Sequence, residues 1–180
     1  MNYTKEDILV DREKRVRFQE ELLDRLGKTL VFIRINYPGV KKDNSISRAI
    51  IIVMDKLLDA MFGSVNVFKL ITVSAEGPNI TMILDKQSLE VKKMCVEIED
   101  NHPLGRCVDI DVYSSDDKRS ISRMSLGKPP RKCFICDESA MICVRAKNHE
   151  FKEVVDYIEK SYEWFKGGCK WKIKMKLKLI

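Results

Sequence analysis

The stretch His102–Val112, HPLGRCVDIDV, decides the fold of this chain. Between positions 108 and 112 three apolar residues alternate with two acids, which is the period-two pattern of a β-strand with one buried face. Asp109 and Asp111 therefore project from the other face, about 7 Å apart along the strand. Two carboxylates this close repel each other unless a cation lies between them, and hard oxygen ligands favour Mg²⁺. The alternative is a solvated strand face that carries two acids.

Helical and extended segments surround this strand. Apolar residues at three- and four-residue spacing, with Thr4 and Gly27 as caps of the first helix, predict helices over 4–27, 46–62, 85–98 and 149–165. Short apolar runs bounded by turn residues predict further strands over 30–36, 65–74, 79–84 and 121–126. Together these elements predict an α+β fold, with a mixed or antiparallel sheet of about five strands and helices packed on it.

Length and charge limit the possible organisation. The 180 residues suit one domain, predicted over 1–168 with a Cys/His cluster at 133–149, and a basic C-terminal tail at 169–180. Five lysines of that tail supply most of the formal charge of +6, so a nearly neutral body gives no support to a nucleic-acid partner. The chain shows no secretory signal and no apolar run long enough for a membrane span. We expect a cytoplasmic protein with no membrane partner and with cysteines that are reduced or bound to metal.

Four potential metal ligands lie within seventeen residues, and they are Cys133, Cys136, Cys143 and His149. Three thiolates and an imidazole are compatible with a structural Zn²⁺ site, which requires a closed tetrahedral shell. One alternative is a group of reduced thiols near a loop, with His149 capping the last helix. A redox disulfide between Cys133 and Cys136 is another.

Basic side chains occur at positions where an anion could be bound. Arg12, Arg15 and Gln19 share one face of the first helix with its apolar residues. Because a buried charge is costly without a partner, we expect Arg12 and Arg15 to line a cavity that holds anions, unless they turn sideways to solvent. Arginine binds phosphate through two parallel hydrogen bonds, and five basic residues lie near the acid pair in sequence: Arg106, Arg123, Arg131, Lys132 and Arg145.

Several segments together resemble a known enzyme family. They are HPLGRCVDIDV, Ser122-Arg123, Leu126–Cys136, the Cys143…His149 segment, Asp11–Arg15 with Gln19, and the loop Asn36–Gly39 with Asn44. In combination they resemble the apo-citrate lyase phosphoribosyl-dephospho-CoA transferases over roughly residues 10–165. Cys107 departs from the pattern, because a larger apolar residue is expected there.

The resemblance implies a nucleotidyltransferase-like fold and a specific reaction. Such enzymes transfer the 2′-(5″-phosphoribosyl)-3′-dephospho-CoA group from its triphosphate precursor, triphosphoribosyl-dephospho-CoA, to a serine of the citrate lyase acyl carrier (gamma) subunit. Diphosphate is released. The resemblance implies that Asp109 and Asp111 hold Mg²⁺, that Gly105 permits close backbone approach and that Arg106 contacts phosphate. It does not imply zinc, and it leaves the third metal-binding acid of nucleotidyltransferases unidentified.

Two other functions remain open. One is a zinc-knuckle module that binds nucleic acid through the basic tail, and it predicts salt-sensitive RNA or DNA binding that is lost when residues 169–180 are removed. The other is a related nucleotidyltransferase with a different acceptor or nucleotide.

Overall fold

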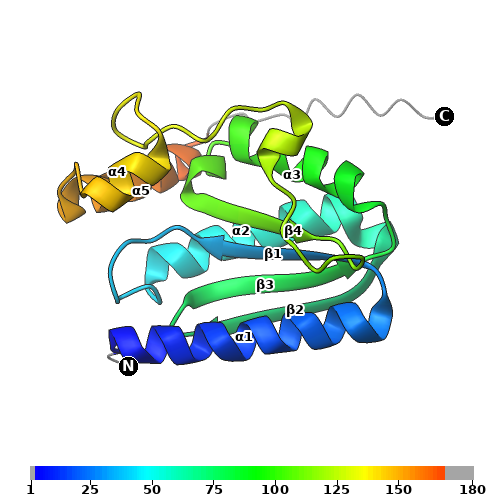
Figure 1. The fold of residues 1–180 in the computed structure, drawn as a ribbon. Coiled ribbons are helices and arrows are strands. Elements are labelled where there is room, and N and C mark those ends of the chain that lie inside the picture. The colour runs from blue at the N-terminus through cyan, green and yellow to red at the C-terminus, as the bar shows by residue number, and fades with distance from the viewer. Residues whose placement is uncertain (1–2, 169–180) are drawn as a thin grey trace.

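The structure, a computed structural model, describes residues 3–168 and contains helices on both sides of an open antiparallel sheet (Figure 1). In chain order the main elements are α1 (Lys5–Leu26), β1 (Thr29–Ile35), α2 (Ser45–Phe62), β2 (Asn66–Ser74), β3 (Gly77–Leu84), α3 (Ser88–Asn101), β4 (Val108–Tyr113), α4 (Ala140–Ala146) and α5 (Phe151–Lys166). The predicted α+β class is confirmed.

The sheet has the strand order β2-β3-β1-β4, and every neighbouring pair is antiparallel. Helix α1 runs along one face, and α2 and α3 lie on the other (Figure 1). The register places Arg34 of β1 opposite Asp109 of β4, and Phe32 opposite Asp111. Because side chains alternate along a strand, all four of these residues share the face that α1 covers.

Each face of the sheet has its own apolar core. The larger core combines residues from every strand except β2 with buried residues of α2, α3 and α5, such as Ile50, Val91 and Ile158. The smaller core, under α1, contains only Leu23, Leu30, Phe32 and Ile83 as buried residues. The α1 face therefore has room for polar side chains, and the candidate site lies there.

The predicted ends of α1 are confirmed. Thr4 and Asp7 form a reciprocal capping box, in which the Thr4 hydroxyl accepts the Asp7 N–H at 3.1 Å. Gly27 ends the helix with φ +59°, in the left-handed region that glycine adopts without strain. Two residues later the chain enters β1, so these caps set where Arg34 falls in the sheet.

The prediction of a strand over 121–126 is wrong, and within residues 3–168 the sheet has four strands instead of about five. Side chains occupy the outer edge of β4 where that strand would pair. Lys92 donates to the Ile110 carbonyl at 3.0 Å, Glu99 accepts the Ile110 N–H at 3.1 Å, and Arg131 donates to the Val108 carbonyl at 2.9 Å. Ser120, just before the predicted segment, forms an isolated bridge with Tyr113, and Arg123–Leu126 form a 3-10 turn.

The short helix α4 was not predicted, because its seven residues are fewer than periodicity can identify. The predicted tail at 169–180 lies outside the described residues.

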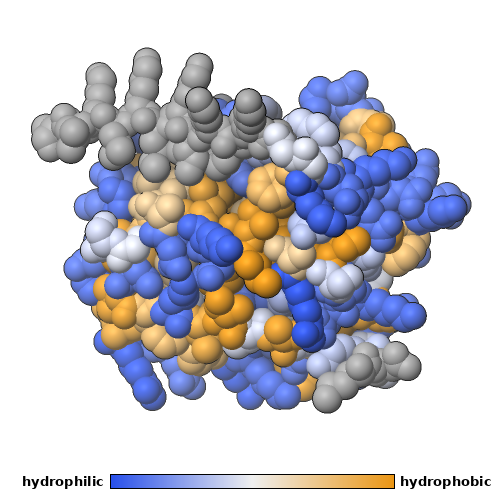
Figure 2. Space-filling model, turned by 180° about the vertical axis from the view of Figure 1, so that it is seen from behind, coloured by the Kyte–Doolittle hydropathy of each residue, from blue (hydrophilic) through white to orange (hydrophobic). Residues whose placement is uncertain are grey.

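Seen from the side of α2, hydrophobic residues interrupt the hydrophilic surface across the middle of the molecule (Figure 2). Exposed apolar residues occur on α2, at Ile52, and on the edge strand β2, at Ile71 and Val73. Among residues 3–168, none of the helices is both long and apolar enough to cross a membrane.

Candidate active site and metal cluster

The two predicted acids lie on one wall of a cavity at the edge of the sheet. Burial alternates along β4, with Val108, Ile110 and Val112 buried and Asp109 and Asp111 half-buried. Both acids line a cavity of about 260 Å³, together with Arg34, Lys92, Glu99, Ser120, Arg123 and Arg131 among others. The alternating pattern of the strand therefore places both predicted carboxylates in one cavity.

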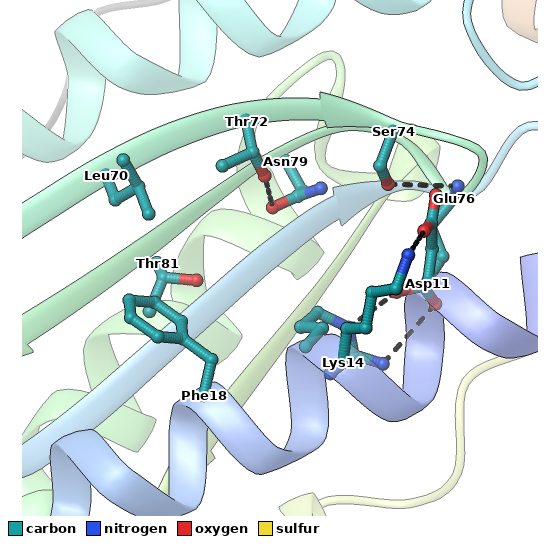
Figure 3. Close-up of a pocket in the computed structure, with 10 residues that line it drawn as sticks. Asp11, Lys14, Phe18, Leu70, Thr72, Ser74, Glu76, Asn79 and Thr81 are labelled. Atoms are coloured by element: carbon teal, nitrogen blue, oxygen red, sulfur yellow. Dashed lines mark hydrogen bonds and ion pairs between the residues drawn. The ribbon is translucent and has the colours of Figure 1, made fainter.

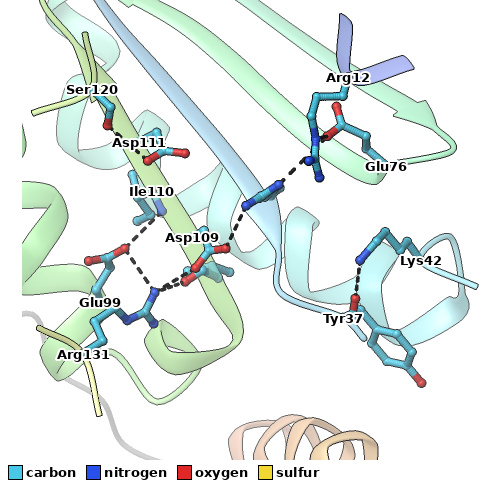
Figure 4. A network of polar contacts seen from close by, with 12 residues as sticks. Arg12, Tyr37, Lys42, Glu76, Glu99, Asp109, Ile110, Asp111, Ser120 and Arg131 are labelled. Carbon is cyan, nitrogen blue, oxygen red and sulfur yellow. Dashed lines mark hydrogen bonds and ion pairs between the residues drawn. The ribbon is translucent and has the colours of Figure 1, made fainter. Parts of the chain in front are cut away.

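Asp109 is held by arginines on both sides. Arg131 Nη1 lies 3.0 Å from Asp109 Oδ1, and Arg34 Nη2 lies 3.4 Å from Oδ2 (Figure 4). Asp111 has a lighter contact, a hydrogen bond of 3.2 Å that its Oδ1 accepts from the Ser120 hydroxyl. Each carboxylate oxygen has two acceptor positions, so both acids retain acceptor positions that these contacts leave open.

Arg131 makes hydrogen bonds both to Asp109 and to the backbone that forms the cavity wall. Its guanidinium donates to the carbonyls of Val108 and Gly105, at 2.9 and 3.0 Å, as well as to Asp109. The same Nη1 lies 3.4 Å from Glu99 Oε1. A planar guanidinium with five donors can hold these acceptors at once, and the side chain is therefore fixed in the cavity wall.

Glu99 is a third acid at the cavity, and the sequence did not reveal it. It is only 5% exposed and accepts hydrogen bonds from the Ile110 N–H and from Arg131. Burial raises the pKa of Glu99, while Arg131, the Ile110 N–H and Lys92 act in the opposite direction. Its position on α3, behind the edge of β4, makes it a support for the strand and for Arg131.

Arg12, Arg15 and Gln19 lie on the sheet side of α1, but the anion that the arginines hold is part of the protein. Arg15 Nε lies 2.7 Å from Glu76 Oε2, and Arg12 Nε lies 3.3 Å from Oε1 (Figure 4). Arg34 Nη1 approaches the same carboxylate at 4.0 Å, and Arg15 also donates to Gln19 Oε1 at 2.9 Å. Glu76, in the β2–β3 turn, is 3% exposed, so a buried carboxylate takes the place expected for a bound anion.

Lys42 adds a further positive charge near Arg34. Its pKa is lowered, first by burial and then by the charges of Arg34 and Arg12. The ammonium donates to the Tyr37 carbonyl at 2.7 Å (Figure 4). The loop after β1 therefore brings a lysine toward the arginines.

A second cavity, of about 290 Å³, lies between α1 and strands β2 and β3. Phe18 of α1 faces Leu70 and Thr81 across it, and the Arg15–Glu76 pair lies at one end (Figure 3). Phe18 and Leu70 give it an apolar part, and the other residues that line it are polar or charged. A ligand that carries both phosphates and an apolar or ring-bearing arm finds matching surfaces on the same face of the sheet.

The remaining predicted residues have different surroundings. Arg123 lines the acid cavity and binds Asp100 at 2.6 Å, and its buried Nε has no hydrogen-bond partner within residues 3–168. Arg106 does not line that cavity; it lies over the Phe134 ring at 5.2 Å and donates to the Lys132 carbonyl. At Gly105 a Cβ would meet the Ile98 carbonyl at 2.2 Å, so packing against α3 requires glycine there.

The predicted cysteine and histidine ligands converge. The ligand atoms of Cys133, Cys136, Cys143 and His149 all lie within 4.8 Å of one another. Cys136 Sγ is 3.4 Å from Cys143 Sγ and 3.3 Å from His149 Nε2. A zinc ion with bonds of about 2.3 Å to sulfur brings tetrahedral ligands to about 3.8 Å from each other. The cluster is therefore compatible with structural zinc, and the cysteines of the described chain are all free thiols.

Thiolate formation is favoured at one ligand. Burial raises the pKa of the Cys133 thiol, but hydrogen bonds from the Ile135 and Cys136 N–H groups and from neighbouring thiols outweigh it and lower the pKa to about 7. Zinc binds cysteine as the thiolate, so this environment suits a metal ligand.

Arg34, Glu76 and Glu99 were missed by sequence reasoning. Arg34 carried a signal, since it is the one charged residue in the strand TLVFIRI, and a charge within an apolar strand requires a partner. Glu76 and Glu99 carried none, because a glutamate in a turn or on an amphipathic helix is ordinarily solvated.

The donor set at Asp109 and Asp111 fits Mg²⁺. Two carboxylates of one strand line one cavity and keep acceptor positions open, and Mg²⁺ usually takes one or two carboxylates with water and substrate phosphates completing its shell. Glu99, which is engaged with Arg131 and the backbone, stands behind this pair.

Comparison with known sequences identifies the family of this chain. Residues 3–165 match the family described as apo-citrate lyase phosphoribosyl-dephospho-CoA transferase. Proteins of that name from Escherichia coli O7:K1 and Shigella boydii serotype 18 are 32% and 31% identical to this chain over 156 residues, which is 85% of the chain and 85% of each relative. This chain belongs to the apo-citrate lyase phosphoribosyl-dephospho-CoA transferase family.

Proposed function

We propose that the protein transfers a phosphoribosyl-dephospho-CoA group from triphosphoribosyl-dephospho-CoA to a serine of the citrate lyase acyl carrier subunit. The supporting observation is that Asp109 and Asp111 line one cavity with three arginines in a chain of this family. The serine oxygen forms a bond to the α-phosphorus as the bond to diphosphate breaks, and the serine proton is released. The nucleophile comes from the acceptor, so the protein itself forms no covalent intermediate.

Asp109 and Asp111 would hold Mg²⁺, which when bound neutralises the phosphates and stabilises charge on the attacking and leaving oxygens. Arg34 and Arg131 hold the Asp109 carboxylate from both sides and fix its direction. Arg123, which lines the acid cavity, would provide donors for a phosphate oxygen. Arg12 and Lys42, near Arg34, extend the positive wall along which the triphosphate lies.

The cavity under α1 would take the CoA-derived arm. It opens on the same sheet face as the acids and is bounded by the Arg15–Glu76 pair. Its residues Phe18 and Leu70 suit a ring or an alkyl chain, whereas the acid cavity suits phosphate.

Mass spectrometry of the apo carrier subunit tests the reaction. Incubation with the protein, Mg²⁺ and triphosphoribosyl-dephospho-CoA should add one phosphoribosyl-dephospho-CoA group to one serine. EDTA should prevent the addition. A carrier subunit that stays unmodified with the wild-type protein, under conditions where a characterised family member modifies it, would refute the proposal.

We also propose that the Cys₃His cluster binds structural zinc. Four ligands from three chain segments would close the shell and leave no position for substrate. The Arg131 carbonyl accepts the Ala140 N–H at 2.9 Å, and Lys132 bridges to Ser139. The metal would therefore secure the backbone on which Arg131 is carried.

Metal analysis of Cys136→Ser tests this role. The wild-type protein should contain about one zinc per chain and the variant far less, with activity reduced by about tenfold because Arg131 is held less firmly. Cys95→Ser, at a buried cysteine outside the cluster, is the control and should retain zinc. Wild-type protein that is fully active without zinc would contradict the proposal.

A further inference from the structure

Helix α4 has an unusual surface for its size. It has seven residues and buries only Cys143, while Met141, Ile142 and Val144 are 57%, 54% and 77% exposed. Single exposed apolar residues are normal on protein surfaces, but three on one short helix form a patch of the kind that marks interaction sites. Nothing within the described chain covers these side chains.

Basic residues lie beside this patch. Between Gly127 and His149 the sequence has five basic residues and only two acidic ones. Arg145 and Lys147, at the end of α4, are exposed, whereas the exposed Lys132 is paired with Asp137 at 2.9 Å. An apolar centre with a positively charged rim is complementary to a protein surface with an apolar centre and an acidic rim.

The patch lies next to the acid cavity. The first residue of α4, Ala140, donates its N–H to the carbonyl of Arg131, whose guanidinium lies against Asp109. Phe134 lies against Tyr157 of α5 at 5.0 Å and under Arg106, which ties this segment to the body of the protein. Figure 1 shows α4 and α5 beside the end of the sheet at which β4 begins.

The size of the acid cavity requires a nearby docking surface. A space of about 260 Å³ admits a serine side chain and phosphates but not a folded protein. The acceptor must therefore rest on the rim while its serine reaches inward. We propose that α4, with the basic residues beside it, is the docking surface for this protein acceptor, whose contacting surface is acidic with an apolar centre. This inference rests on the proposed function.

Steady-state labelling of the apo carrier subunit by charge-reversed variants tests the inference. In Val144→Glu/Lys147→Glu the KM for the carrier should rise by about tenfold or more, which corresponds to about 1.4 kcal/mol of lost binding. The kcat at saturating carrier and the KM for triphosphoribosyl-dephospho-CoA should change by less than about twofold, because neither residue contacts the reacting atoms. Raising the salt concentration should increase the carrier KM more for wild type than for the variant.

Two further variants make the test specific. Ile52→Glu places the same charge at an apolar residue of α2 that is 55% exposed, and it should leave the carrier KM unchanged. Val144→Ser removes apolar surface without adding charge and should raise the carrier KM by a smaller factor than the double variant. Thermal unfolding of each variant checks that the fold is kept.

The outcomes separate the two proposals. If wild type labels the carrier and both α4 variants do so with an unchanged KM, the docking inference is overturned and the proposed function stands. If wild type leaves the carrier unlabelled, the proposed function fails and the docking inference fails with it. The docking inference would also be overturned if the protein bound RNA in a salt-sensitive way, the α4 variants abolished that binding and the carrier KM stayed unaffected.

Discussion

Two clusters of carboxylates and arginines lie on the same face of the sheet, and they differ in burial. Glu76 is 3% exposed and is surrounded by Arg12, Arg15 and Arg34. Asp109 is held by Arg34 and Arg131, but its side chain is 28% exposed and it lines an open cavity beside Asp111. Arg34 belongs to both clusters and joins them.

The difference separates an acid with a structural environment from the acids that we propose to be reactive. A buried carboxylate with its acceptor positions taken by arginines has nothing left for a ligand. Losing it leaves the largely buried charge of Arg15 without its ion-pair partner. A half-buried carboxylate with open acceptor positions can bind a cation and substrate. Similar residue types therefore predict opposite results on mutation: loss of stability at Glu76 and loss of activity at Asp109 and Asp111.

The largest effect is expected at the reactive acids. Asp109→Asn and Asp111→Asn should each lower kcat by about 10³-fold or more, because the amide cannot neutralise a cation at the phosphates. The unfolding midpoint should move little, since both side chains are half-buried. Carrier labelling and thermal unfolding measure the two quantities. Asp24→Asn on α1, an exposed acid, is the control and should retain full activity. If the variants at both acids retain activity, Asp109 and Asp111 are not reactive, and the two clusters do not differ in the way that we propose.

Glu76→Gln should show the converse result. Removing one charge from a buried ion-pair cluster costs about 3 kcal/mol in the free energy of unfolding. The activity of the folded fraction should fall by less than at Asp109, because Glu76 is not in the acid cavity. Urea unfolding gives the stability change. Asp43→Asn breaks an exposed pair with Arg48 and should cost less than about 1 kcal/mol. Equal costs at Glu76 and Asp43 would show that burial is not the cause.

Sequence reasoning predicted that Asp109 and Asp111 lie together, but it did not predict the cluster around Glu76. The alternation in VDIDV places both acids on one face, and Cys-x-x-Cys with the following Cys and His predicts the metal cluster, because local spacing determines these arrangements. Glu76 meets Arg12 and Arg15 only through the packing of α1 across the sheet, over more than sixty residues of sequence. No local pattern encodes that contact, so the partner of the inward-facing arginines was predicted as a ligand.

The same reason accounts for the error in the sheet. Residues 121–126 have an acceptable strand pattern, but side chains from α3 and Arg131 already satisfy the outer edge of β4. Whether an edge is open depends on what else packs there, which is a tertiary property. The ends of α1 were predicted well because the caps at Thr4 and Gly27 are local.

Arg131→Lys tests whether the arginine on Asp109 acts through its shape or only its charge. Lysine keeps the charge but cannot donate to Val108, Gly105 and Asp109 together, so kcat should fall by about 10- to 100-fold. Initial rates of carrier labelling measure it. Arg17→Lys, an exposed arginine of α1, should leave the rate unchanged. Full activity in Arg131→Lys would mean that charge alone suffices at the reactive cluster.

The smallest effect concerns Glu99, which is buried like Glu76 but borders the acid cavity. Burial raises its folded-state pKa above the unfolded value of 4.5, against the opposing charges of Arg131 and Lys92. A raised pKa means that the folded state keeps the proton longer than the unfolded state. The contribution of Glu99 to stability is therefore greatest below pH 4.5 and declines as pH rises through the folded pKa.

Glu99→Gln removes this titration, so the stability of the variant relative to wild type should improve as the pH rises from 4.5 toward 7.5. Urea unfolding of both proteins across that range measures the difference. A relative loss of stability in the variant as pH rises would show that the ion pairs of Glu99 outweigh its burial. Glu99 would then belong with Glu76 as a paired structural acid, and burial alone would no longer distinguish the acids that this sheet uses for packing from those it uses for chemistry.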